Sequence, residues 1–162
     1  VFLYQGRMEF GARALGNRSI LASPSSRDSK NKLNLKIKKR VWYQPFCPTI
    51  LEKDSKKVFS DMDYPEKYMT MGFMVKEKYR DKMNAVTNVD GSARPQMLSN
   101  ENKRYEKILN EMKKHNGIGA VLNTSFNLHG YPIVNTPKEA IEVMVRTGNK
   151  YMAMENFFVE LV

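Results

Sequence analysis

Residues 101–123 read ENKRYEKILNEMKKHNGIGAVLN. Within them, apolar side chains recur with the spacing of one helix face, at Tyr105, Ile108, Leu109 and Met112. This spacing predicts a helix over 101–115, and Gly117 lies where glycine commonly ends a helix. The mostly apolar run 118–123 then predicts a buried strand. A helix followed at once by a buried strand indicates a sheet with helices on it.

The rest of the chain repeats this mixture of strands and helices. Residues 137–147 and about 26–39 predict two more helices, the second of them rich in lysine. Short apolar runs predict strands at 1–5, 19–23, 69–75, 118–123, 151–154 and 157–161. A turn at Asp90-Gly91 further predicts a hairpin within 86–98. We therefore expect an α/β or α+β fold with a helix-covered sheet.

Composition limits the class of protein. With 162 residues and 41% hydrophobic residues, the chain is long enough for one domain, residues 1–162, with a core of its own. A net charge of +10 indicates anionic partners such as nucleotides, nucleic acid or a membrane surface. The single Cys47 fits a reducing compartment. No run of about 18 apolar residues occurs, so we expect a cytoplasmic protein without a membrane span.

Residues 6–19, GRMEFGARALGNRS, alternate glycines with arginines. Glycine lets the backbone turn tightly, and guanidinium groups match phosphate oxygens two at a time. We interpret the segment as an anion-binding loop in which Arg7, Arg13 and Arg18 bind phosphate. A basic surface loop with solvated arginines is the alternative.

Two further groups of residues fit an anion site. Lys38, Arg40 and Arg94 add three cations, which would form a pocket for a polyphosphate or acyl phosphate if the fold gathers them. Polar side chains also follow a predicted strand, where ligands of α/β sheets commonly bind, at Asn123, Thr124, Ser125 and Asn127. A plain polar turn is the alternative there. Neither histidine forms a triad pattern, so chemistry would rest on positioning and charge neutralisation.

Residues 6–21 resemble the signature GRMEFGPRALGNRSIL, which opens the C-terminal domain of the NodU/CmcH carbamoyltransferase family, with Ala12 in place of proline. Three later segments, 38–48, 86–96 and 122–134, resemble K-x-R-E-x-F-R-P-F-A-P, V-T-H-V-D-G-T-A-R-V-Q and L-N-T-S-F-N…G-E-P-I-V of the same domain. Residues 136–141 match the helix that comes next. The resemblance covers nearly the whole chain in the family's order.

The resemblance implies a YrdC-like fold, a twisted mixed sheet covered by helices. It implies a domain of an O-carbamoyltransferase that uses carbamoyl phosphate and ATP, with Mg²⁺, to form carbamoyl adenylate. Lys38, Arg40 and Arg94 would then be the catalytic cations. The nucleotide and acyl phosphate would contact Arg7, Arg13, Arg18, Asn123, Thr124, Ser125 and Asn127. A separate N-terminal domain carrying a histidine-bound metal would be the partner, and the chain would be a fragment of the longer protein.

Two alternatives stay open beside this enzyme. Four departures from the family pattern, Val41, Gln44, Asn88 and Tyr131, favour a catalytically degenerate scaffold of the same fold. The positive charge favours an RNA-binding module, although Trp42 and Tyr43 beside Arg40 supply only one place for base stacking. Pairing with a second copy of the chain, and the carbamoyl acceptor, are not determined by the sequence.

Overall fold

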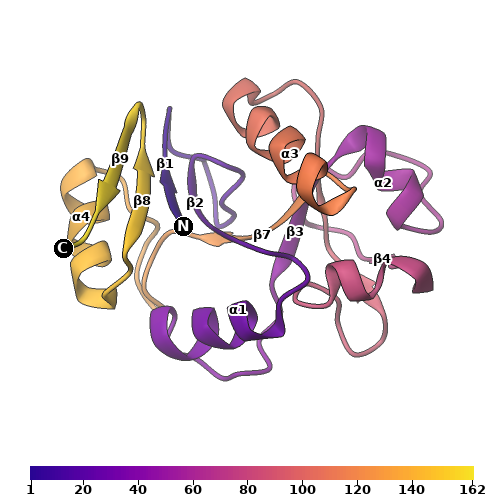
Figure 1. Ribbon diagram of the computed structural model, residues 1–162, viewed down its shortest axis with the longest axis horizontal. Coiled ribbons are helices and arrows are strands. Elements are labelled where there is room, and N and C mark those ends of the chain that lie inside the picture. The colour runs from indigo at the N-terminus through magenta and orange to yellow at the C-terminus, as the bar shows by residue number, and fades with distance from the viewer. The chain divides into compact units, whose positions relative to one another are not determined.

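The computed structural model describes residues 1–162, and the chain folds into two compact units. Unit 1 comprises Val1–Ala22, Asp28–Gln44 and Asn123–Val162. Unit 2 comprises Ser23–Arg27 and Pro45–Leu122. Figure 1 traces the chain and its elements, and each unit is described by itself below. No helix combines the length and apolar character that a membrane crossing requires.

Unit 1 is built on a mixed sheet. Strand β1 (Phe2–Tyr4) pairs antiparallel with β2 (Arg18–Ala22) and parallel with β8 (Tyr151–Met154). Strand β9 (Phe157–Glu160) pairs antiparallel with β8 and completes the order β2-β1-β8-β9. All three residues of β1 are buried, as a strand between two neighbours requires.

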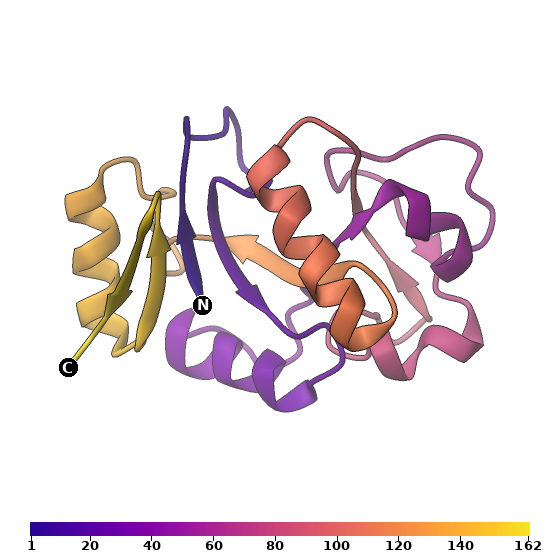
Figure 2. The same cartoon turned by 45° about the horizontal axis from the view of Figure 1, so that its top comes forward.

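Two helical segments belong to unit 1. Helix α4 (Pro137–Thr147) lies beside the β8–β9 pair in both views (Figures 1 and 2). Its first turn is fixed by a capping box, in which Thr136 and Glu139 satisfy each other's backbone amides. Helix α1 (Arg27–Lys32) continues as the π-helical turn η1 (Leu33–Ile37) and ends at Lys38.

Unit 2 contains a parallel strand pair, β3 (Cys47–Leu51) and β6 (Gln96–Leu98). Strand β7 (Ala120–Ser125) begins beside β3, where the Leu51 amide donates to the Gly119 carbonyl at 2.8 Å, and continues into unit 1. The remaining elements are helices α2 (Glu52–Val58) and α3 (Lys103–Asn116), the 3₁₀ turns η2 (Glu77–Tyr79) and η3 (Asp81–Met83), and the short antiparallel pair β4 (Phe73–Met74) and β5 (Ser92–Ala93).

A buried carboxylate joins three segments of unit 2. The side chain of Asp54 on α2 is fully buried and accepts from Lys113 of α3 at 2.6 Å and from the Gly119 amide at 3.1 Å. Burial by itself would raise the pKa of Asp54, but the hydrogen bonds from Lys113 and Gly119 outweigh it and keep the pKa below its ordinary value. The charged carboxylate therefore holds α2 and α3 to the start of β7.

The mixed strand pairing with covering helices confirms the expected α/β fold, and it is compatible with a YrdC-like sheet. The helix expected at 137–147 is α4, and the helix expected at 101–115 is α3. Asn102 caps α3 by accepting from the Tyr105 amide, and Gly117 ends it with a left-handed φ of 77°.

Two predicted elements were wrong. The turn at Asp90-Gly91 forms, but no hairpin follows, because β5 pairs with β4 and β6 pairs in parallel with β3. The strand expected at 69–75 shrinks to β4. The reason is the buried Glu66 carboxylate, which accepts from the Tyr68 amide and the Thr70 hydroxyl, both at 2.7 Å, and folds 66–70 into a turn.

Candidate functional site

The candidate site is centred on Lys38, at the end of the α1–η1 helical segment. The Lys38 amide donates to the Leu33 carbonyl at 2.8 Å, which closes the π-helical turn. Lys39 then takes a positive φ of 50° and turns the chain out of the helix. Lys39 is exposed, whereas the side chain of Lys38 points inward and the residue is only 2% exposed.

The Lys38 ammonium contacts two residues that follow the end of β7. It donates to the Asn127 side-chain oxygen at 2.6 Å and to the Asn127 carbonyl at 3.1 Å. It also donates to the Ser125 carbonyl and lies 3.2 Å from the Ser125 hydroxyl. We call Lys38, Ser125 and Asn127 the Lys38 cluster. All three were predicted site residues, and the structure brings them together within unit 1.

The environment of Lys38 makes its charge adjustable near neutral pH. Burial lowers the pKa of Lys38 to about 7, and the nearby Arg40 guanidinium acts in the same direction by charge repulsion. An anion bound here would favour the ammonium form and oppose both effects. An anion close to the cluster would therefore raise the pKa of Lys38.

A buried asparagine that the sequence analysis missed holds Arg40 in place. Asn34 is fully buried, and its side-chain oxygen accepts from Arg40 Nε at 2.7 Å. Its amide group donates to the carbonyls of Trp42 at 2.9 Å and Gln44 at 3.0 Å. One side chain thus fixes the whole segment 40–44. An asparagine among lysines on a helix carries no local signal of this role.

The other two polar residues of β7 have different surroundings. Asn123 is buried and donates to the Ala14 carbonyl at 3.0 Å, so it joins β7 to the glycine–arginine loop, residues 6–18. Thr124 lies half-buried between Asn123 and Ser125. The hydrogen bonds of the Lys38 ammonium go instead to Ser125 and Asn127.

Arg18 lies inside the glycine–arginine loop. Its guanidinium packs over the Tyr4 ring at 3.6 Å and donates to the Gln5 carbonyl at 2.8 Å and the Gly6 carbonyl at 3.1 Å. It also donates to the carbonyl of Asn135 at 3.3 Å. With only 4% of its surface exposed, Arg18 holds the loop to β1 and to the segment before α4.

Three backbone amides near the end of this loop already donate to an anion, the carboxylate of Glu9. One Glu9 carboxylate oxygen accepts from the amides of Leu15 and Asn17, both at 2.7 Å, and of Arg18 at 3.3 Å. Arg7 and Arg13 are exposed, as is Phe10 between them. The two exposed arginines are therefore the loop's cations that an external anion can reach. No local pattern indicates this role of Glu9, because a glutamate between arginines resembles ordinary surface charge in a sequence.

Arg94 is the remaining predicted cation. It is half-buried between β5 and β6 and belongs to unit 2, whereas the Lys38 cluster and the glycine–arginine loop belong to unit 1. Within unit 1, Lys38 ends the α1–η1 segment and Arg40 follows it two residues later, and the exposed Arg7 and Arg13 come from a loop that Asn123 joins to β7.

No group of three or more histidine, cysteine, aspartate or glutamate side chains is placed to hold a metal ion.

Comparison with known proteins places this architecture in a family. Residues 1–161 match the family model described as Carbamoyltransferase C-terminus. An uncharacterized protein of Methanocaldococcus jannaschii is 42% identical over 99% of this chain, which covers 26% of that protein. Nodulation protein NolNO of Sinorhizobium fredii is 40% identical over 96% of the chain, which covers 23% of that protein. Nodulation protein U of Sinorhizobium fredii is 43% identical over 80% of the chain, which again covers 23% of that protein.

The chain thus spans about a quarter of the length of these relatives. The match to the family model is nevertheless continuous from the first strand to the last. It includes the glycine–arginine loop, the segment with Lys38 and Arg40, and the end of β7. The chain therefore belongs to the family of carbamoyltransferase C-terminal domains.

Proposed function

We propose that the chain binds ATP and carbamoyl phosphate and forms carbamoyl adenylate as a domain of an O-carbamoyltransferase. The observation that carries the proposal is the buried Lys38 ammonium, held by Ser125 and Asn127 beyond the end of β7. A strand end with a buried cation and polar donors is a common place for a phosphorylated ligand in α/β proteins. Membership of the carbamoyltransferase family supplies the reaction class.

The reaction balances with one water. Carbamoyl phosphate, ATP and water give carbamoyl adenylate, pyrophosphate and inorganic phosphate. Water first cleaves the bond between the carbamoyl oxygen and phosphorus of carbamoyl phosphate, which releases inorganic phosphate and leaves carbamate. A carbamate oxygen then forms a bond to the α-phosphorus of ATP, and the bond from that phosphorus to pyrophosphate breaks. The carbamoyl group would then pass to an acceptor hydroxyl, a step that we assign to the remainder of a longer protein.

Each candidate site residue of unit 1 would have a different role in this reaction. Lys38 and Arg40 would neutralise the charge of the carbamate and the α-phosphate, because positioned cations are the main source of catalysis in such transfers. Ser125 and Asn127 orient the Lys38 ammonium through the contacts described above. Arg7 and Arg13 would bind the outer phosphates.

The test is isothermal titration of the chain with a non-hydrolysable ATP analogue and with carbamoyl phosphate, followed by a pyrophosphate-release assay. Lys38→Ala should weaken binding by about tenfold or more, because a buried charge-assisted hydrogen bond is lost. Lys36→Ala removes an exposed lysine from the same helical segment and should have little effect.

Three outcomes would decide against the proposal. Absence of binding of either ligand to the folded wild-type chain would overturn it. Steeply salt-dependent affinity for RNA without nucleotide binding would favour the RNA-binding module. Ligand binding without pyrophosphate release, together with activity restored by Gln44→Arg, would favour the degenerate scaffold.

A further inference from the structure

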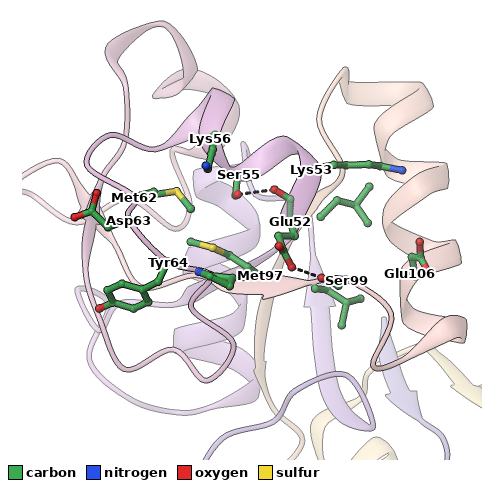
Figure 3. Close-up of a pocket in the computed structure, with 13 residues that line it drawn as sticks. Glu52, Lys53, Ser55, Lys56, Met62, Asp63, Tyr64, Met97, Ser99 and Glu106 are labelled. Carbon is green, nitrogen blue, oxygen red and sulfur yellow. Dashed lines mark hydrogen bonds between the residues drawn. The ribbon is translucent and has the colours of Figure 1, made fainter.

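A cavity lies entirely within unit 2. It has a volume of about 540 Å³ and is lined by α2, the end of β6, α3 and the segment 62–65 (Figure 3). Its volume falls in the range of about 300–1,000 Å³ that is typical of small-molecule sites. The residues of the Lys38 cluster do not line it, so the function proposed above leaves it unexplained.

The parallel pairing of β3 and β6 produces the polar centre of this cavity. Leu51, the last residue of β3, is in register with Leu98, the last residue of β6. The residues that come next, Glu52 and Ser99, must therefore emerge side by side at the carboxyl ends of two neighbouring strands. This is the position at which parallel sheets commonly bind ligands.

Only one of the two oxygens of the Glu52 carboxylate has a hydrogen-bond partner. Ser99 donates its hydroxyl to one carboxylate oxygen, as Figure 3 shows, and the other oxygen accepts no hydrogen bond within unit 2. Two nearby lysines have partners of their own. Lys53 donates to Asn110 of α3 at 3.0 Å, and Lys67 forms an ion pair with Glu101. The free oxygen of Glu52 is therefore an acceptor for a ligand.

The charge of the lining is opposite to that of the chain. Three carboxylates, Glu52, Asp63 and Glu106, line the cavity against two ammonium groups, Lys53 and Lys56, and Glu106 forms an ion pair with Lys103 at 3.6 Å. The whole chain, by contrast, has 27 lysines and arginines against 17 aspartates and glutamates. The carboxylates of Glu52 and Asp63, which form no ion pair, are therefore the lining charges that favour a cationic ligand over an anionic one.

The rest of the lining is apolar and aromatic. Leu51, Met97 and Leu98 supply apolar surface between the polar groups. Tyr64 lies at the side of the cavity, half-exposed, and its ring packs edge-on against Phe73 at 6.1 Å. A flat apolar body fits methionine and tyrosine side chains well.

We propose that this cavity binds a small primary amine with an apolar or aromatic body. The ammonium group donates to Glu52, and the body lies on Met97 and Tyr64. This site does not depend on the function proposed for the Lys38 cluster, and neither ATP nor carbamoyl phosphate takes part in it.

The test uses three probes of similar size that differ in charge: benzylamine, benzyl alcohol and benzoate. Amide chemical shifts of the full 162-residue chain are followed by NMR during each titration. We expect benzylamine to bind with a Kd on the order of 1 mM and to shift the amides of Glu52, Ser99 and Met97. Benzyl alcohol should bind about tenfold more weakly or worse, because it lacks the charge-assisted hydrogen bond, and benzoate more weakly still.

Glu52→Gln tests the role of the carboxylate. It keeps an oxygen for the Ser99 hydroxyl but removes the charge, and we expect about a tenfold loss of benzylamine affinity. Glu77→Gln makes the same chemical change at an exposed position of unit 2 outside the cavity, and it should leave the affinity unchanged.

Equal affinity for the three probes would overturn the proposal. So would amide shifts confined to residues away from the cavity, or no benzylamine binding at about 10 mM. A thermal melt checks that Glu52→Gln is folded. If it is not, the probe series and the shift map on the wild-type chain decide the question without any variant.

Discussion

At the residue scale, neighbouring cations of similar sequence context have different roles. Lys38 is buried against Ser125 and Asn127, whereas Lys39 beside it is exposed. Arg18 holds backbone carbonyls of its own loop, whereas Arg13 of the same loop is exposed. The difference lies in the partners that each side chain meets, and burial sets how easily its charge can change.

The lowered pKa of Lys38 leads to a prediction about pH. In the folded chain the Lys38 ammonium should lose its proton at about pH 7. An unfolded lysine keeps its proton up to its ordinary pKa of 10.5. The unfolded chain then binds more protons between these values, so the Lys38 contribution to stability should rise with pH across this window. A bound anion should raise the pKa of Lys38.

NMR of lysine side chains labelled at Cε measures this directly. One signal should titrate near pH 7, disappear in Lys38→Arg and shift to higher pH when ATP is added. If every lysine signal titrates near its ordinary value, the assignment of Lys38 as a buried, adjustable cation is wrong.

At the element scale, local signals predicted the helices better than the short strands. Helix α4 has a threonine cap, a proline in its first turn and a glycine at its end, all within the segment itself. Strands β4 and β5 are two residues each, and β5 pairs with β4, about 20 residues earlier, rather than with β6, which follows it directly. Such pairing depends on contacts with distant residues, which short apolar runs do not encode.

One glycine controls how closely β7 approaches its neighbours in unit 2. A Cβ atom on Gly119 would lie 3.0 Å from the Leu109 carbonyl of α3 and would collide with the Leu51 side chain of β3. We expect Gly119→Ala to lower the free energy of unfolding by about 1–3 kcal/mol, since overpacking of a core costs this much.

Denaturant unfolding monitored by circular dichroism checks the value. Gly130→Ala is a useful comparison, because a Cβ there meets no atom within 4 Å, although its φ of 83° adds backbone strain of its own. Gly119→Ala with unchanged stability would show that α3 and β3 can move apart freely.

At the scale of the whole molecule, the net charge of +10 should draw anions to the protein from a distance. We expect the affinity for ATP to fall between about 0.05 and 0.5 M salt, because screening shortens the reach of exposed charges. Exposed Arg7 and Arg13 should account for part of this dependence, and buried Lys38 for less of it.

Titrations at several salt concentrations test this on the wild-type chain and on Arg7→Ala/Arg13→Ala. The double variant should show weaker binding and a shallower dependence on salt. Arg27→Ala/Arg80→Ala removes two exposed arginines of unit 2 and serves as the charge-matched control. An equal effect of both pairs would mean that net charge alone, and not the loop, attracts the ligand.

The sequence by itself determined the helices with their caps, the turns of the glycine–arginine loop and the family of the domain. These features depend on residues a few positions apart, and Gly6, Gly11 and Gly16 indeed all take positive φ. Which cations an external ligand can reach depends instead on the tertiary structure. Lys38 meets Ser125 across 87 positions of the sequence, and Asn34, Glu9 and the cavity at Glu52 depend equally on which segments the fold brings together. The burial of a charged side chain and the identity of its hydrogen-bond partners are set by that packing, so no local sequence pattern could have revealed them.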